Sequence, residues 1–169
     1  YSSPLERLLT EIDGPHALLG WSMGGLVALE VAARIPGSIS HLIICASTCK
    51  FCSDESYIIG TAPQAVQGML RGIERDREGM LRSFFEHAYD GAGDETVIQN
   101  ALASALQSPE GALEDGLSYL LSVDVREQLA NIAIPTLLIH GREDMVIPFA
   151  ASAYLGERLS QSNLILLDG

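Results

Sequence analysis

The most constraining stretch of this sequence is Gly-Trp-Ser-Met-Gly-Gly at residues 20–25, which places Ser22 between glycines in a Gly-x-Ser-x-Gly spacing. An apolar run at residues 16–19 precedes it, and a helical pattern at residues 26–35 follows it. A serine on a sharp turn between a strand and a helix adopts a strained backbone conformation that lifts its hydroxyl clear of the sheet. We expect Gly20 and Gly24 to be required because a Cβ atom at either position would crowd the turn.

This context predicts that Ser22 is a catalytic nucleophile; the alternative is an incidental serine in a glycine-rich turn. The turn places Ser22 at the N-terminus of a helix, where partial positive charge favours a developing oxyanion. The backbone N–H of Met23, the next residue, is the expected oxyanion donor. A serine hydroxyl is a weak nucleophile until a base takes its proton, and a carboxylate holds that base in the right tautomer.

Size and charge exclude several classes of function. The chain has 169 residues, enough for one domain with a sizeable core, and a formal net charge of −12. This charge argues against nucleic acid and against an anionic membrane surface as partners, and no apolar run approaches the ~20 residues of a membrane helix. Residues 1–4 show no signal-peptide pattern, which favours a cytoplasmic location, although a chain lacking its own start would look the same.

Three cysteines, Cys45, Cys49 and Cys52, have a spacing that resembles the iron–sulfur signature of radical S-adenosylmethionine enzymes. Cys45 lies inside the apolar run at residues 42–46, which favours a small buried strand residue instead. The chain also lacks the repeated strand–helix units that such a barrel requires. We therefore expect no metal and no cofactor.

Strand and helix patterns alternate at both ends of the chain and give way to helices in the middle. Apolar runs without polar alternation predict buried strands, as in a parallel sheet, at residues 16–20, 41–46 and 136–140, and a fourth apolar strand at residues 163–167. Helical spacing predicts helices at residues 4–12, 23–35, 62–75, 78–89, 95–107, 109–123 and 149–159. We expect residues 1–47 and 132–169 to form an α/β core and residues 48–131, too long for a plain crossover, to form a helical cap.

Asp144 is the expected acid that orients the base. It follows the strand predicted at residues 136–140, so it shares with Ser22 the carboxyl ends of the strands, where sites form in open parallel sheets. The alternative for Asp144 is a turn residue that caps the next helix. Asp124 and Asp168 are rival acids.

None of the four histidines is clearly placed as the base. His16 and His41 begin strands, which puts them at the opposite end of the sheet from Ser22. His87 lies in the predicted cap, and His140 ends the strand that carries Asp144 and is expected to pack in the core. Without a base, the chain as it stands should acylate slowly or not at all.

These motifs together resemble the α/β-hydrolase family. Residues 20–25 are similar to its nucleophile turn, residues 138–148 are similar to its strand and acid loop, and the 122 positions between Ser22 and Asp144 leave room for a cap. The resemblance implies a mostly parallel sheet flanked by helices, with an inserted helical cap. Within the family, residues 20–25, 44–47, 116–117 and 122–126 resemble the pimeloyl-[acyl-carrier-protein] methyl ester esterases of biotin biosynthesis.

The resemblance implies a serine carboxylic-ester hydrolase that acts through an acyl-enzyme. Other members with caps are carbon–carbon bond hydrolases and cofactor-free haloperoxidases, and a non-catalytic fragment is the reading from another class. The family has strands before the serine turn, one followed by a loop that supplies a second oxyanion donor. Its base histidine comes just after the last strand, and this sequence ends at Gly169 where that histidine is expected. We therefore expect the sequence to be incomplete at both ends.

The cap is expected to set the substrate. Apolar side chains of the cap and beside the nucleophile would contact an acyl chain; those expected to bind substrate are Trp21, Leu81, Phe84 and Phe85. The alternative is that they only hold the cap on the core. Arg71, Arg75 and Arg82 would share one face of a continuous helix and meet an acidic carrier protein, although a solvated face is favoured. The expected partner is a small-molecule ester or an acyl ester on a carrier protein.

Overall fold

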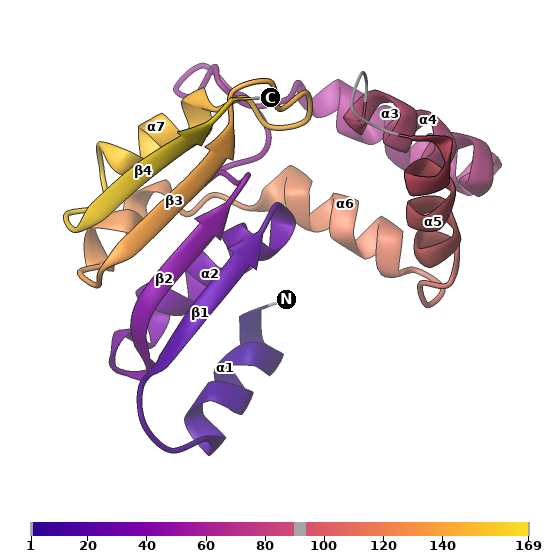
Figure 1. Cartoon of the computed structure of the whole chain (residues 1–169). Helices are drawn as coiled ribbons and strands as arrows, with labels where there is room; N and C mark the ends of the chain where they lie inside the picture. Colours follow the sequence, from indigo (N-terminus) through magenta and orange to yellow (C-terminus); the bar gives the residue numbers. More distant parts are fainter. Residues whose placement is uncertain (1, 90–93, 169) are drawn as a thin grey trace.

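The computed structural model describes residues 2–89 and 94–168, and its centre is a four-stranded sheet (Figure 1). The strands are β1 (His16–Trp21), β2 (Ile39–Cys45), β3 (Thr136–Gly141) and β4 (Ser162–Leu167). They lie in the order β1-β2-β3-β4, and every neighbouring pair is parallel. Strand directions and positions therefore agree with the prediction, apart from shifts of one or two residues at the ends.

One face of the sheet is covered by helices. These are α2 (Met23–Arg34), which follows β1, and α7 (Ala150–Gly156), which connects β3 to β4. The short helices η1 (Pro36–Ser38) and η2 (Arg126–Asn131) precede β2 and β3, and α1 (Ser2–Glu11) packs on α2. The core lies between this layer and the sheet, and its fully buried side chains include Leu26, Leu29, Leu42, Ile44, Leu138 and Leu155.

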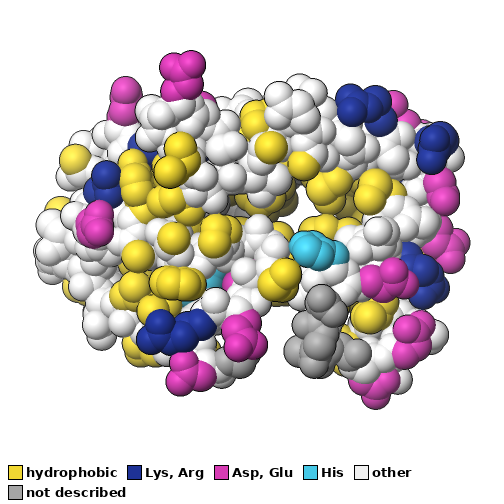
Figure 2. Space-filling view, turned by 90° about the horizontal axis from the view of Figure 1, so that it is seen from above, with side chains coloured by type: hydrophobic (Ala, Val, Ile, Leu, Met, Phe, Trp, Pro, Cys, Tyr) yellow, Lys and Arg dark blue, Asp and Glu magenta, His cyan; other side chains and the backbone are white. Residues whose placement is uncertain are grey.

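The other face of the sheet is apolar and open at β1 and β4 within the described residues (Figure 1). Trp21 is 66% exposed and Leu19 61% on β1, while Leu167 is 51% and Ile165 42% exposed on β4. Figure 2 shows hydrophobic side chains gathered over this half of the molecule, on the left. The prediction that β1 is buried on both faces is therefore wrong for the described chain, because apolar composition alone does not show which face a helix covers.

Four helices occupy the segment between β2 and β3. They are α3 (Pro63–Arg75), α4 (Arg77–Ala88), α5 (Glu95–Leu106) and α6 (Ala112–Ser122). In Figure 1 they form an arm beside the sheet, in which α3 packs on α4 and α6, and α4 packs on α5. Figure 2 shows a hollow between this helical half and the sheet half. Among the described residues, no helix combines the length and apolar character needed to cross a bilayer.

Asp76 separates α3 from α4. Its backbone leaves the helical conformation, and its carboxylate accepts a hydrogen bond from the Gly79 N–H at 3.0 Å, which caps α4. Arg71 and Arg75 therefore lie on a different helix from Arg82, which pairs with Glu95 at 3.5 Å. The continuous helix that would align the three arginines is absent, because a local side-chain cap stops it.

Candidate active site

Ser22 occupies the turn between β1 and α2 with φ 52° and ψ −124°, a region that residues other than glycine rarely adopt. Three hydrogen bonds hold its main chain in place. The Ser22 N–H donates to the Cys45 carbonyl at 3.0 Å, and the Ser22 carbonyl accepts from the Gly25 N–H at 2.9 Å and from the Ser47 hydroxyl at 2.6 Å. The strain is therefore stabilised from β2 as well as from α2.

Two glycines make this turn possible, and one of them is not the expected one. A Cβ atom on Gly20 would lie 2.5 Å from the Gly24 carbonyl oxygen and 2.6 Å from the Gly25 Cα, which confirms the expected crowding there. A Cβ atom on Gly24 would meet nothing within 4 Å, so that part of the prediction is wrong for the described chain. The second tight contact belongs to Gly25, whose Cβ atom would lie 2.5 Å from the Ser47 Cβ. A side chain at residue 24 would therefore enter open space, whereas one at residue 25 would meet Ser47, just after β2.

Met23 and Trp21 flank the serine on the chain. Met23 is the first residue of α2, so its N–H has no carbonyl acceptor one turn earlier in the helix. Trp21 is the last residue of β1, and its side chain lies on the open face of the sheet. The Met23 N–H, the expected oxyanion donor, thus lies at the turn. The Trp21 side chain, which is expected to contact substrate, lies on the exposed apolar face of the sheet.

Asp144 lies in the loop after β3, and its carboxylate is held by the loop itself. Its Oδ1 accepts hydrogen bonds from the backbone N–H groups of Val146 and Ile147, both at 2.9 Å. Its Oδ2 lies 3.4 Å from Nε2 of His140, and the side chain is 18% exposed. β1 and β3 run parallel on either side of β2, so Ser22 and Asp144 both follow carboxyl ends of strands at one edge of the sheet.

The rival acids are engaged elsewhere. Asp124 lies 2.7 Å from Nη2 of Arg126 and 3.0 Å from Nζ of Lys50, and these partners lower the pKa of its carboxyl to about 2. Asp168 pairs with Arg142 at 2.9 Å and its side chain is 93% exposed. Both rival carboxylates are therefore occupied by arginine or lysine partners at the surface, and Asp144 stays a prediction.

Within the described residues, none of the four histidines forms a hydrogen bond with the Ser22 hydroxyl. His16 begins β1, about 20 Å of strand away from Ser22. His41 lies near the start of β2 and is exposed, as is His87 on α4. His140 is buried and bonded to Ser152 and to Ile147. The expectation that His140 packs in the core is confirmed.

The expected substrate residues of the arm lie together on α4. Leu81 is 6% exposed, while Phe84 and Phe85 are half-buried and make an edge-to-face contact with ring centroids 5.3 Å apart. Phe85 also stacks on Tyr89 at 6.4 Å. These contacts show that both phenyl rings pack within the arm, in line with the alternative that such residues hold it together.

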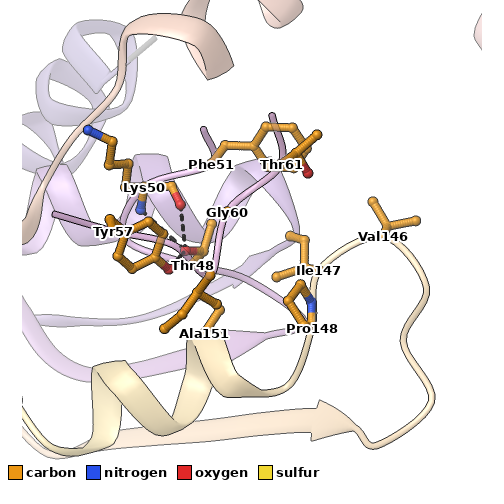
Figure 3. Close-up of a pocket in the computed structure, with 11 residues that line it drawn as sticks. Thr48, Lys50, Phe51, Tyr57, Gly60, Thr61, Val146, Ile147, Pro148 and Ala151 are labelled. Carbon is orange, nitrogen blue, oxygen red and sulfur yellow. Dashed lines mark hydrogen bonds between the residues drawn. The ribbon is translucent and has the colours of Figure 1, made fainter. Parts of the chain in front are cut away.

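The segment after β2 packs against the loop that carries Asp144. Figure 3 shows a small pocket there, with Thr48, Tyr57 and Gly60 on one side and Ile147, Pro148 and Ala151 on the other. The Thr48 hydroxyl and the Tyr57 hydroxyl lie 2.8 Å apart, and burial raises the pKa of Tyr57 to about 12. Burial also raises the pKa of the nearby Cys49 thiol to about 11, so the thiol stays protonated at neutral pH. All three cysteines are free thiols.

Sequence reasoning missed the supporting roles of Ser47, Ala46, His140 and Ser152 at the candidate site. Ser47 is fully buried and donates to the Ser22 carbonyl, and Ala46 beside it also has a positive φ, 44°. His140 and its partner Ser152 are buried behind the Asp144 loop. The resemblance of residues 44–47 to the esterases was the only available signal, because contacts between distant segments leave no periodic pattern.

Comparison with known protein families matches residues 4–169 to the family described as alpha/beta hydrolase fold. Two similar proteins are pimeloyl-[acyl-carrier protein] methyl ester esterases. The one from Neisseria meningitidis serogroup B (strain H44/76) is 33% identical over 96% of this chain and 64% of its own length. The one from Aeromonas salmonicida (strain A449) is 34% identical over 99% of this chain and 68% of its own length.

Two solved structures have closely similar folds. The esterase EaEST from Exiguobacterium antarcticum has a TM-score of 0.92 at 24% identity, over 98% of this chain and 63% of its own. A bromoperoxidase from Bacillus anthracis has a TM-score of 0.91 at 22% identity, over 99% and 64%. The predicted fold class is confirmed by these matches. The chain spans about two thirds of the length of the proteins that it resembles.

Proposed function

Because the chain belongs to the α/β-hydrolase family, we propose that the protein is a serine carboxylic-ester hydrolase with Ser22 as nucleophile and Asp144 as orienting acid. The observation that carries this proposal is the backbone of Ser22 at φ 52°. Such a conformation has a free-energy cost on the order of 1–3 kcal/mol. It gives no packing in return, so its retention supports a role for the hydroxyl that it presents.

In the proposed reaction, the Ser22 oxygen attacks the ester carbonyl carbon while a base takes the hydroxyl proton. The Met23 N–H, which has no acceptor in the helix, donates to the oxyanion. The bond to the alcohol then breaks, and the alcohol leaves with the proton held by the base. Water attacks the acyl-enzyme, the base takes a proton from it, and the acid product and the Ser22 hydroxyl form. Within the described residues no histidine bonds to Ser22, so the mechanism assigns the base to no particular residue.

We further propose that the substrate is a pimeloyl methyl ester carried on an acyl-carrier protein, which would place the enzyme in biotin biosynthesis and in the cytoplasm. The relatives at 33–34% identity that bear this name support the proposal. In it, residues 48–131 act as the cap, and Trp21, Leu81, Phe84 and Phe85 contact the acyl chain. The net charge of −12 does not favour an acidic carrier, so contact with one would rest on local cations such as Arg71 and Arg75 of α3.

The intact mass of the purified protein, before and after a serine-directed fluorophosphonate, tests the mechanism. One covalent adduct on Ser22 that is absent from the Ser22→Ala variant is the expected result. A protein that takes no adduct contradicts the proposed hydrolase. It would instead favour a second candidate, a fold without activity, which the histidines support because none of them bonds to Ser22 in the described residues.

Growth and rate measurements test the substrate. The protein should restore biotin-independent growth to a strain that lacks the pimeloyl-carrier esterase, and Ser22→Ala should not. Rates on short p-nitrophenyl esters, dienoic ketoacids and bromide with peroxide should separate an esterase from a carbon–carbon bond hydrolase and a haloperoxidase. Labelling of Ser22 without restored growth would retain the esterase and reject the pimeloyl substrate.

A further inference from the structure

We propose that His140 is a positioning residue that fixes the carboxylate of Asp144 for the reaction, an inference that rests on the function proposed above. The imidazole of His140 is completely buried, although histidine is a polar side chain with two nitrogens to satisfy. Both nitrogens have partners. Nδ1 lies 2.7 Å from the Ser152 hydroxyl, and Nε2 lies 2.8 Å from the Ile147 carbonyl.

These partners define the tautomer of His140. A carbonyl oxygen can only accept, so Nε2 must carry the proton that is donated to Ile147. In the neutral ring Nδ1 is then an acceptor, and the Ser152 hydroxyl donates to it. The ring is satisfied on both sides as a neutral imidazole, which is consistent with its burial. A ring held in this way cannot act as the base that takes the Ser22 proton.

Nε2 of His140 also lies near the carboxylate of Asp144, although its N–H is donated to the Ile147 carbonyl. Its Oδ2 lies 3.4 Å from Nε2, while its Oδ1 accepts the N–H groups of Val146 and Ile147. His140 therefore links the residue that begins the loop, Asp144, to Ile147 three residues later. One oxygen of the carboxylate is thus held by the backbone, the other lies beside the buried imidazole, and the side chain remains 18% exposed.

In this arrangement the positioning of the Asp144 carboxylate and the removal of the Ser22 proton belong to two different groups. His140 keeps the carboxylate at a fixed angle, and a separate base is oriented by the carboxylate. Without His140, Oδ1 would still accept from the backbone, but the carboxylate could rotate about its bond to the chain. A rotating carboxylate loses alignment in the transition state without loss of substrate binding.

The test compares His140→Leu and His140→Gln with Leu138→Ala in the purified protein. Leu138 lies two residues earlier on the same face of β3 and is fully buried in the main hydrophobic core, so its truncation serves as the control for a loss of stability. We expect His140→Leu to lower kcat about 10–100-fold at unchanged KM, the range typical when a hydrogen-bond partner behind a functional side chain is removed. His140→Gln, whose amide N–H can reach the same oxygens, should recover most of that loss.

Each outcome decides a different claim. If His140→Leu and Leu138→Ala lower the melting temperature and leave kcat equally unaffected, His140 is only a core residue and the inference is overturned. If nitrogen-15 spectra of the imidazole show the proton on Nδ1, the proposed contacts are wrong whatever the kinetics. If the fluorophosphonate does not label the wild-type protein, the proposed function is overturned, and the positioning role of His140 with it.

Discussion

The turns that carry Ser22 and Asp144 follow parallel strands of one sheet, yet they are held in opposite ways. The turn after β1 depends on main-chain geometry, because its serine has φ 52° and a Cβ atom on Gly20 or Gly25 would strike its neighbours. The loop after β3 depends on hydrogen bonds from two backbone N–H groups to the Asp144 carboxylate and from the buried His140 to the Ile147 carbonyl. The first should be intolerant of added volume, and the second should be intolerant of a changed donor or acceptor.

The largest expected effect comes from Asp144→Asn, which changes the hydrogen-bonding character of the loop and leaves its volume unchanged. If the amide oxygen accepts from Val146 and Ile147, the amide nitrogen takes the place of Oδ2, 3.4 Å from Nε2 of His140, and two donor nitrogens lie side by side. We expect kcat to fall about 10⁴-fold, as when a triad carboxylate becomes an amide. Urea unfolding should show a loss of about 1–3 kcal/mol from the unsatisfied groups.

The matched control is Asp168→Asn, which makes the same chemical change at an exposed carboxylate paired with Arg142. Its free energy of unfolding should change by no more than about 0.5 kcal/mol and kcat should not change. A loss of kcat in Asp168→Asn without one in Asp144→Asn would show that Asp168, the rival acid, has the role assigned to Asp144.

The next effect is steric and belongs to the serine turn. Gly20→Ala forces a Cβ atom to within 2.5 Å of the Gly24 carbonyl oxygen, and backbone atoms cannot move aside as a flexible side chain can. We expect a loss of about 3 kcal/mol or more in the free energy of unfolding, measured in urea. Gly24→Ala, with open space around the new methyl group, should be neutral or stabilising by up to about 1 kcal/mol. Equal losses would mean that Gly24 is enclosed by groups outside the described residues.

A smaller effect tests whether Ser47 and Gly25 form one unit. Gly25→Ala should cost about 2 kcal/mol because its Cβ atom meets the Ser47 side chain, which is fully buried. In a Ser47→Gly background that obstacle is gone, so the added cost of Gly25→Ala should fall by about 1 kcal/mol or more. Additive losses in this double-mutant cycle, read from urea unfolding, would show that the Ser47 side chain is not what excludes a Cβ atom at residue 25.

The same comparison explains which features could be predicted. Ser22 is predictable from the sequence because a turn without room for Cβ atoms requires glycines next to the serine. The crowding predicted at Gly24 is found at Gly25 instead. Strand and helix positions were predicted within a few residues because apolar runs and helical spacing are local signals. The support of Asp144 was not predictable, since His140 and Ser152 are 12 residues apart and neither matches a pattern. The open face of β1 and β4 was missed because composition does not identify covering helices.

A third junction lies where the helical arm leaves and rejoins the sheet. It is held by charged side chains, unlike the serine turn and the acid loop. Lys50 and Asp124 pair as an antiparallel bridge between its two connections, and Asp124 also pairs with Arg126. Arg126 in turn donates to the Ser56 hydroxyl at 2.9 Å, which lies on the first connection. Lys50, Asp124 and Arg126 thus link the two connections between the sheet and the helical arm.

Asp124→Asn should therefore have the smallest effect of the series, about 1 kcal/mol or less at neutral pH, because these charges are partly exposed. The pH dependence of this effect distinguishes a contribution of the Asp124 charge from one of packing. The Arg126 guanidinium and the Lys50 ammonium lower the pKa of Asp124 from 3.8 to about 2, so its contribution is complete above pH 3.8 and is lost as the pH falls through 2. The difference in unfolding free energy between wild type and variant, followed by urea titration from pH 6 to 2, should shrink towards zero. A difference that stays constant down to pH 2 would mean that Asp124 contributes through packing, and the arm would then resemble the serine turn more than the acid loop.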